Sequence, residues 1–321
     1  MAGMRKKNIT GNIKRKMNEW LDTIEDEALK NDVKNDIVVT GGCIASMLLG
    51  EPVNDYDVYF KRFETACRVT DYYIAKFLEN RVAIQGGIPV EMFSERLVDS
   101  MNRQRVRVVV KSAGVAGDTQ SKEYGYFESD STATPEAGEY IDDIYENVQA
   151  VAEVDDTVLP IKPDYAPVFL SSNAITLKGG VQLIIRFHGG ADAIHENFDF
   201  VHTMNYFTFA DGVVLNPDSL EAILSKTLTY KGSLYPICSV FRTKKFIERG
   251  WKINAGQYLK MALQISKLDL TNYLILEEQL TGVDVAYFKE VLSKAQSKNE
   301  DGTPSLIVDT AYLTEVINRM F

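Results

Sequence analysis

Apolar and polar residues along this chain follow two periods, and each period predicts a type of element. Over residues 13–33 the apolar positions recur at helical spacing, which predicts an amphipathic helix. The continuous apolar run 37–39 predicts a buried strand, residues 44–49 a short amphipathic helix, and residues 55–60 a second strand. The first half of the chain therefore opens with a helix and continues as strand, helix, strand.

The same periods predict the remaining elements. Residues 64–78 have helical spacing, and short strands are expected at 81–84, 90–93, 105–110, 168–180, 181–189 and 198–209. Mixed helices and strands of this kind predict a layered α/β or α+β domain. From residue 255 onward the pattern is helical, with an expected core-facing stripe that begins at Tyr258, Leu259, Ala262, Leu263 and Ile265.

Composition divides the chain into parts. Residues 1–34 hold a basic arm and the first helix, 35–225 a domain of mixed helices and strands, and 226–321 a helical domain. The arm is either a solvated segment or a contact for phosphate groups. Residues 114–167 are rich in acids, Gly, Ser, Thr and Pro, and this segment is either a solvated loop or small subdomain, or a lid or docking surface.

Charge and cysteine content narrow the function classes. The formal charge of −10 argues against indiscriminate nucleic-acid binding, although a local basic groove remains compatible with it. The three cysteines, Cys43, Cys67 and Cys238, lack the spacing of a zinc site or a disulfide framework. No apolar run approaches the ~20 residues that span a bilayer, so a cytoplasmic protein without membrane contact is expected. The sequence does not indicate an oligomeric state.

The chemistry is concentrated between the first two predicted strands. Gly41 and Gly42 follow the first strand and open a helix, and Asp55 and Asp57 lie two apart on the second strand, so their side chains share one side. Paired carboxylates can hold divalent cations, and a glycine turn at a helix N-terminus can accept a triphosphate on its backbone N–H groups. The alternative is a buried strand–turn–helix with two capping or turn aspartates.

This stretch resembles the signature of polymerase-β-type nucleotidyltransferases, in the version of bacterial-type tRNA nucleotidyltransferases and poly(A) polymerases. Their pattern is G-G-x-V-R-D-x-L-L-G-R-x-x-x-D-x-D. The residues that match in register without a gap are Gly41, Gly42, Ile44, Leu48, Leu49, Gly50, Asp55 and Asp57. The Arg-Asp pair of the pattern is replaced by Ala45-Ser46, and the Arg after its third glycine by Glu51. The resemblance implies that residues 35–225 form an α+β nucleotidyltransferase head with a mixed β-sheet and that residues 226–321 form an all-helical neck-like domain. Compared with the head domain of that family, the acidic residues 114–167 are an insertion.

The resemblance also implies a third carboxylate on a strand beside the second strand, and Asp199 is our candidate. Related tRNA enzymes often carry a Glu on the preceding strand, where this chain has Gln182. Residues 197–206 resemble a family segment that touches ribose and triphosphate, so Asn205 and also Ser46 are expected to contact nucleotide. The alternative for Asp199 is a strand-edge or turn acid, and His202 nearby is either structural or an acid–base group.

A second similar stretch covers residues 236–253, which resemble the helix that links head and neck in that family. Arg242, Lys245 and Arg249 are spaced three and four apart and form a basic stripe on a helix. As implied by the resemblance, Arg242 and Lys245 bind nucleotide phosphates. The alternative is a solvated helix face.

Together these features predict an enzyme of the nucleotidyltransferase class. It would move a nucleoside monophosphate from an NTP to a hydroxyl and release pyrophosphate, with Asp55, Asp57 and Asp199 holding two Mg²⁺ ions, or Mn²⁺ in their place. The resemblance implies an RNA 3′ end, tRNA-like, as the acceptor. The alternatives are nucleotidylation of a protein or small molecule, and a non-catalytic relative that binds nucleotide or a partner.

Overall fold

The fold is that of a computed structural model of the 321-residue chain. The structure describes residues 3–84, 90–98, 102–112, 122–124, 126–128 and 164–270, together with 275–276, 279, 297–298 and 304–305. Most of the acidic insertion 114–167 and most of residues 271–321 lie outside the described residues, so the predictions for them stay predictions.

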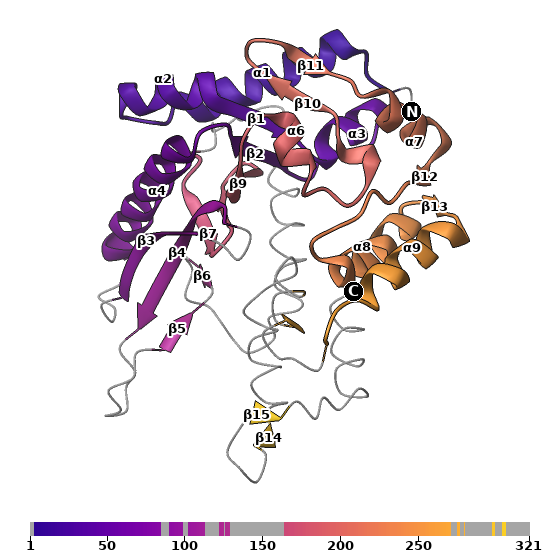
Figure 1. Ribbon diagram of the computed structural model, residues 1–321. Helices are drawn as coiled ribbons and strands as arrows, with labels where there is room; N and C mark the ends of the chain where they lie inside the picture. The colour runs from indigo at the N-terminus through magenta and orange to yellow at the C-terminus, as the bar shows by residue number, and fades with distance from the viewer. Residues whose placement is uncertain are drawn as a thin grey trace.

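The described chain contains both helices and strands, and the strands from β3 to β9 follow one another between α4 and α6 (Figure 1). The helices are α1 (Lys6–Leu21), α2 (Glu27–Asp36), α3 (Gly42–Leu49), α4 (Phe63–Ile84), α6 (Ala191–His195), η2 (Val201–Thr203), α7 (Pro217–Ser225), α8 (Pro236–Glu248) and α9 (Ala255–Ile265). The strands are β1 (Ile37–Thr40), β2 (Tyr56–Phe60), β3 (Val90–Val98), β4 (Gln104–Ser112), β5 (Lys122–Tyr124), β6 (Tyr126–Glu128), β7 (Pro167–Ser171), β8 (Ala174–Leu177), β9 (Val181–His188), β10 (Tyr206–Thr208), β11 (Gly212–Val214), β12 (Thr227–Leu228), β13 (Lys252–Ile253), β14 (Ser297–Lys298) and β15 (Pro304–Ser305).

A mixed eight-stranded sheet is the centre of the fold. Its strand order is β11-β10-β1-β2-β9-β8-β7-β6, and β2 runs parallel to β9 while the other neighbours are antiparallel. A separate sheet of β3, β4 and β5 lies against α4. The mixed sheet within an α+β fold is confirmed.

One face of this sheet is buried under helices. Ile37 and Val39 of β1, and Val58 and Phe60 of β2, are at most 1% exposed and belong to a core that includes the apolar stripe of α1. Side chains alternate along a strand, so Val38, Asp57 and Tyr59 point to the opposite face. On that face Val38 and Tyr59 form a smaller apolar cluster with Ile194 of α6. Asp57 lies two residues before Tyr59, at the margin of this cluster.

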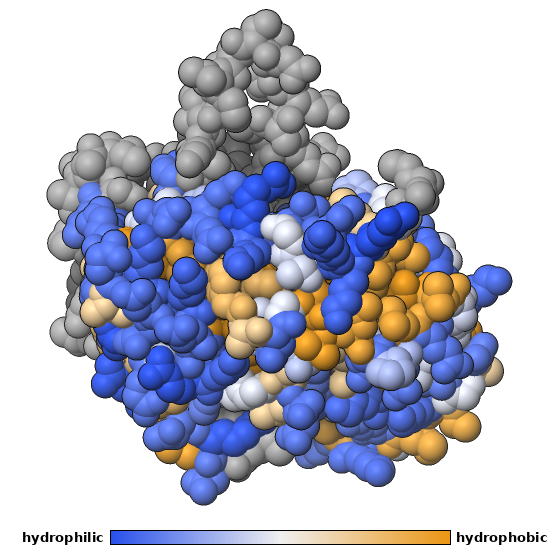
Figure 2. Space-filling view, turned by 90° about the horizontal axis from the view of Figure 1, so that it is seen from above, coloured by the Kyte–Doolittle hydropathy of each residue, from blue (hydrophilic) through white to orange (hydrophobic). Residues whose placement is uncertain are grey.

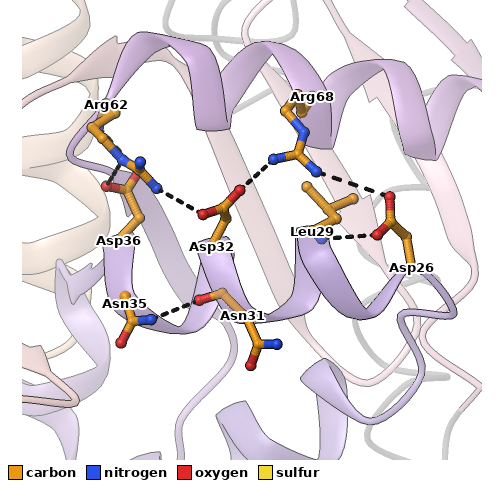
Figure 3. A network of polar contacts seen from close by, with 8 residues as sticks. All are labelled: Asp26, Leu29, Asn31, Asp32, Asn35, Asp36, Arg62 and Arg68. Atoms are coloured by element: carbon orange, nitrogen blue, oxygen red, sulfur yellow. Dashed lines mark hydrogen bonds and ion pairs between the residues drawn. The ribbon is translucent and has the colours of Figure 1, made fainter.

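Hydrogen bonds and ion pairs join α2 to α4 (Figure 3). The Asp36 carboxylate, only 4% exposed, accepts hydrogen bonds from the backbone N–H of Arg62 at 3.0 Å and from its Nε at 2.9 Å. Arg68 of α4 forms ion pairs with Asp32 and Asp26. At its other end, α2 begins at Asp26, whose side chain accepts from the Leu29 N–H at 2.9 Å as an N-cap.

The N-terminal helical prediction was wrong in its extent. The structure has two helices where one was expected over 13–33, because Asp26 caps a new helix after the break at Asp22. The first helix begins at Lys6, so most of the basic arm is helical.

Viewed from above, the molecule shows a mostly hydrophilic surface with apolar residues gathered in one area (Figure 2).

Two predicted strands are absent at their predicted places. Residues 81–84 belong to α4, and residues 201–203 form the short helix η2 in place of the first part of the strand expected at 198–209. Phe200 makes a single antiparallel bridge with Tyr230, and strand geometry resumes at β10. The expected helix 64–78 and the strands near 90–93 and 105–110 are confirmed by α4, β3 and β4.

The region after residue 226 is helical only in part. The strands β12 and β13 pair in parallel and precede and follow α8, so an all-helical neck is not confirmed. In α9 the buried side chain is Met261, whereas Tyr258, Leu259 and Leu263 are 43%, 60% and 56% exposed. The core-facing stripe predicted for this helix is therefore wrong.

Candidate functional site

The turn between β1 and α3 has a backbone geometry that only glycine tolerates. Gly41 has φ 93° and ψ −150°, and its N–H donates to the Thr203 carbonyl at 3.2 Å. A Cβ at Gly41 would lie 2.4 Å from Oδ2 of Asp57, so the glycine makes room for that carboxylate. At Gly42, the first residue of α3, a Cβ would meet nothing within 4 Å. Of these two glycines, only Gly41 is required by the local geometry of the protein.

The two aspartates lie together at the start of β2. Asp57 is opposite Thr40 on β1 and opposite Gln182 on β9, and Asp55 immediately precedes the strand. Burial raises the pKa of Asp55, and burial together with the Asp55 charge raises the pKa of Asp57 well above its usual range. Arg249 and Arg242 act in the opposite direction on the pKa values of Asp55 and Asp57 respectively. Burial and mutual repulsion make it costly for both carboxylates to ionise, and a bound cation would offset this cost.

Asp199 forms an ion pair with Arg242. It lies just before η2, not on a strand beside β2, where the neighbours are β1 and β9. Its carboxylate, 9% exposed, accepts from the Arg242 guanidinium at 2.7 Å, and this charge raises the pKa of Arg242. Across the described residues, no group of three or more His, Cys, Asp or Glu side chains could hold a metal ion.

Arg249, just after α8, belongs to a second polar cluster. Its guanidinium donates to Oγ of Ser46 at 3.3 Å and to the Glu51 carboxylate at 3.2 Å, and Glu51 also pairs with Lys226 at 2.8 Å. The side chain of Ser46, expected to contact nucleotide, thus lies against Arg249. The sequence stripe of Arg242, Lys245 and Arg249 contains this residue, but only the tertiary structure shows that it reaches Ser46 and Glu51.

Asn205 and Lys245 differ in position from the other predicted site residues. Asn205 is fully buried; its Nδ2 donates to Ser219 at 2.7 Å and its Oδ1 accepts from the Asn216 N–H at 2.9 Å. Both ends of this amide fix the N-terminus of α7, which is a structural role within the protein, and the predicted contact of Asn205 with nucleotide stays a prediction. Lys245 is exposed on α8.

Buried histidines lie beside the site without a polar pair suited to proton transfer. The pKa of His202 is lowered by burial to about 4, and its ring packs 4.2 Å from Trp251 and 4.6 Å from Phe246 between ring centroids. The pKa of His195 is likewise lowered to about 4 by burial, and its Nε2 lies 2.8 Å from the hydroxyl of Thr40. Sequence reasoning missed His195 as a neighbour of the Gly41 turn, because its link to Thr40 spans 155 positions.

The residues present fit one magnesium-bound polyphosphate better than a site with three protein carboxylates. Mg²⁺ is commonly held by one or two carboxylates together with substrate phosphates. Asp55 and Asp57 supply that number, Gly41 leaves space for Asp57, and Arg242 and Arg249 are near enough to influence the charge of the pair.

Three known proteins can be compared with this chain. "Gabija anti-defense 2" of Bacillus phage SPbetaL7 is 22% identical over 144 residues, which cover 42% of this chain and 36% of that protein. The crystal structure of the Bacillus stearothermophilus CCA-adding enzyme in complex with CTP has a TM-score of 0.35 and 11% identity, covering 83% of this chain and 48% of that one. The Thermotoga maritima CCA-adding enzyme complexed with tRNA has a TM-score of 0.37 and 12% identity, covering 94% and 68%.

The chain therefore spans little more than a third of the length of the phage protein that it matches. In the part of the chain that the structure describes, no helix is long and apolar enough to cross a membrane. A family model described as "Gabija anti-defense 2 family protein" matches residues 12–226, which is most of the chain. The protein belongs to the Gabija anti-defense 2 family.

Proposed function

We propose that this protein is a metal-dependent nucleotidyltransferase that counteracts Gabija defence. It would transfer a nucleoside monophosphate from an NTP to a hydroxyl acceptor and release pyrophosphate. The observation that carries the proposal is the juxtaposition of Asp55 and Asp57 with the Gly41 turn, in which a glycine leaves space for one carboxylate. The family membership supports the anti-defence role.

The residues of the site divide the work. Asp55 and Asp57 would hold Mg²⁺ or Mn²⁺, and the metal, when bound, would neutralise charge on the phosphates and on the attacking oxygen. The N-terminus of α3 presents backbone N–H groups beside these carboxylates, which is a suitable place for an anionic phosphate. Arg242 would offset charge near Asp57 once the nucleotide is bound.

Two acceptors are supported by different observations. The sequence resemblance to tRNA nucleotidyltransferases and poly(A) polymerases supports an RNA 3′ end. Membership of an anti-defence family supports a hydroxyl on a component of the Gabija defence, which is nucleotidylation of a protein.

A non-catalytic, partner-binding protein is the second candidate function. The observation that favours it is the 2.7 Å ion pair between Asp199 and Arg242, since it occupies the acid that was expected to complete the metal site. Such a protein would need neither a metal ion nor turnover of NTP to counteract Gabija.

Labelled nucleotides decide among these functions. Purified protein is incubated with Mg²⁺ or Mn²⁺ and each α-labelled NTP, once with total RNA and once with a lysate of cells that carry Gabija. Asp57→Asn is the test variant, and Asp22→Asn, whose side chain is 73% exposed, is the matched control. We expect label transfer with the wild type and the control, and none with Asp57→Asn.

The acceptor that carries the label distinguishes RNA from protein. If neither is labelled while Asp57→Asn still protects phage in Gabija-bearing cells, the catalytic proposal fails and the partner-binding function is supported.

A further inference from the structure

We infer that Arg249 and Lys226, joined through Glu51 and placed beside Ser46, form the binding site for the terminal phosphates of the nucleotide. The inference deepens the proposed function and rests on it, because it assigns the part of the site that would hold the leaving pyrophosphate.

The cluster is assembled from three separate segments. Glu51 follows α3, Lys226 follows α7, and Arg249 follows α8. The Glu51 carboxylate accepts from Lys226 at 2.8 Å and from Arg249 at 3.2 Å, and these two cations lower its pKa against the effect of burial. One carboxylate between two cations leaves the cluster with a net positive charge, as an anion site requires.

The cluster lies along the chain segment that leads from α3 to the aspartate pair. Ser46, which Arg249 contacts at 3.3 Å, lies four residues after Gly42, so it occupies the same side of α3 as the start of that helix. Glu51 lies in the connection between α3 and β2, four residues before Asp55. A polyphosphate with one end held at the aspartates would therefore extend toward Arg249.

The sequence departs from the nucleotidyltransferase pattern at the point where this cluster forms. The pattern has an arginine at the position of Glu51, and an acid there would repel phosphate. Arg249 and Lys226 converge on that acid and reverse the local sign of charge. We therefore assign the cationic role at this place to Arg249, which comes from a different part of the chain.

The guanidinium has capacity left for a ligand. An arginine carries five N–H donors, and one nitrogen of Arg249 makes both of the contacts described, to Ser46 and Glu51. Its side chain is 44% exposed and that of Lys226 is 36% exposed, so both are accessible to solutes. A half-exposed ion pair contributes little to stability, and the arrangement orients Arg249 more than it holds the fold together.

Inorganic tripolyphosphate tests the inference without any turnover. Its binding in the presence of Mg²⁺ is measured by calorimetry on the wild type, Arg249→Ala and Arg15→Ala. Arg15 is a matched control because its side chain is 74% exposed on α1, whose buried stripe packs on the face of the sheet opposite to Asp57. We expect Arg249→Ala to bind tripolyphosphate roughly ten- to a hundredfold more weakly, as loss of a hydrogen bond to a charged group predicts, and Arg15→Ala to match the wild type.

Kinetics separates this inference from the proposed function. If label transfer occurs and Arg249→Ala leaves the KM for the NTP and tripolyphosphate binding unchanged, the inference is wrong while the function stands. If no label transfer occurs but tripolyphosphate binding still depends on Arg249, the anion site stands and the proposed reaction does not. An Arg249→Lys variant with intermediate affinity would support direct contact with phosphate, since it keeps the charge and loses the forked geometry. No binding by the wild type would overturn the inference.

Discussion

Gly41 shows how much one residue decides in this site. Its backbone lies in a region that glycine alone enters readily, and its missing side chain is the space that the Asp57 carboxylate occupies. The neighbouring Gly42 has an ordinary helical position with open space around it. The two glycines look equivalent in the sequence and are not equivalent in the structure.

A matched pair of substitutions tests this difference. Gly41→Ala should lower the free energy of unfolding by about 1–3 kcal/mol from backbone strain, with more from the clash with Asp57, and it should abolish label transfer. Gly42→Ala should change stability by less than about 1 kcal/mol, because alanine favours the helix. Urea unfolding measures both, and equal losses for the two variants would contradict the structural distinction.

His202 makes a second prediction at the scale of a residue. The unfolded chain binds a proton near the ordinary pKa of 6.5, whereas burial lowers the folded pKa to about 4, so the unfolded state binds more protons between these values. The free energy of unfolding should therefore fall as the pH drops from about 6.5 to 4, by on the order of 3 kcal/mol for this group.

His202→Phe should reduce the steepness of this fall, because its ring keeps the packing against Phe246 and Trp251 and does not titrate. Unfolding measured at several pH values gives the slope. His195, whose pKa is also lowered to about 4, would maintain the rest of it. An unchanged slope in the variant would contradict the burial of a neutral His202.

Among the elements, α2 is joined by hydrogen bonds and ion pairs to α4 and to Arg62, the residue before it. Asp36 accepts from both the backbone and the side chain of Arg62, and it does so at the point where α2 passes into β1 (Figure 3). This joint sets the place at which β1 enters the sheet, only a few residues before Gly41.

Removing either partner should have unequal effects. Asp36→Ala removes the buried carboxylate that accepts from the Arg62 N–H and should cost about 2 kcal/mol, whereas Arg62→Ala keeps that backbone bond and should cost about 1 kcal/mol or less because the guanidinium is half-exposed. Chemical denaturation of the two variants provides the comparison. A larger loss for Arg62→Ala would show that the guanidinium, and not the carboxylate, holds this joint.

On the scale of the whole molecule, two arginines connect the region of α8 to the elements around the site. Arg242 reaches from α8 to Asp199, and Arg249 reaches from the end of the same helix to Glu51 and Ser46. These two contacts attach α8 to the part of the molecule that carries Asp55 and Asp57.

A double-mutant cycle measures the first of these contacts. Asp199→Asn and Arg242→Gln should each destabilise the protein, and their combination should cost less than the sum, with a coupling of roughly 1 kcal/mol because Arg242 is 45% exposed. Thermal or chemical unfolding of the four proteins gives this energy. Strict additivity would mean that the ion pair contributes nothing to stability, and Asp199 would again be a candidate metal ligand.

The sequence alone determined the local elements around the site. The apolar run of β1, the glycine pair, the helix α3 and the strand β2 follow from period, turn residues and side-chain alternation, which act over a few positions. The same local rules placed Asp55 and Asp57 on one side of a strand. The mixed sheet was implied by the family resemblance and not by these local rules, and it is confirmed.

Only the tertiary structure decided which distant groups meet those aspartates. A local pattern cannot show that Asp199 pairs with Arg242, that the Asn205 amide forms hydrogen bonds at α7, or that Arg249 pairs with Glu51. Each of these contacts joins residues at least 11 positions apart, and most join far more distant ones. The same limit explains the errors in the strand at 198–203 and in the buried face of α9, where packing against other segments overrides periodicity. The chemistry that the sequence can name is the pair of carboxylates, and its cationic surroundings depend on how the chain folds back on itself.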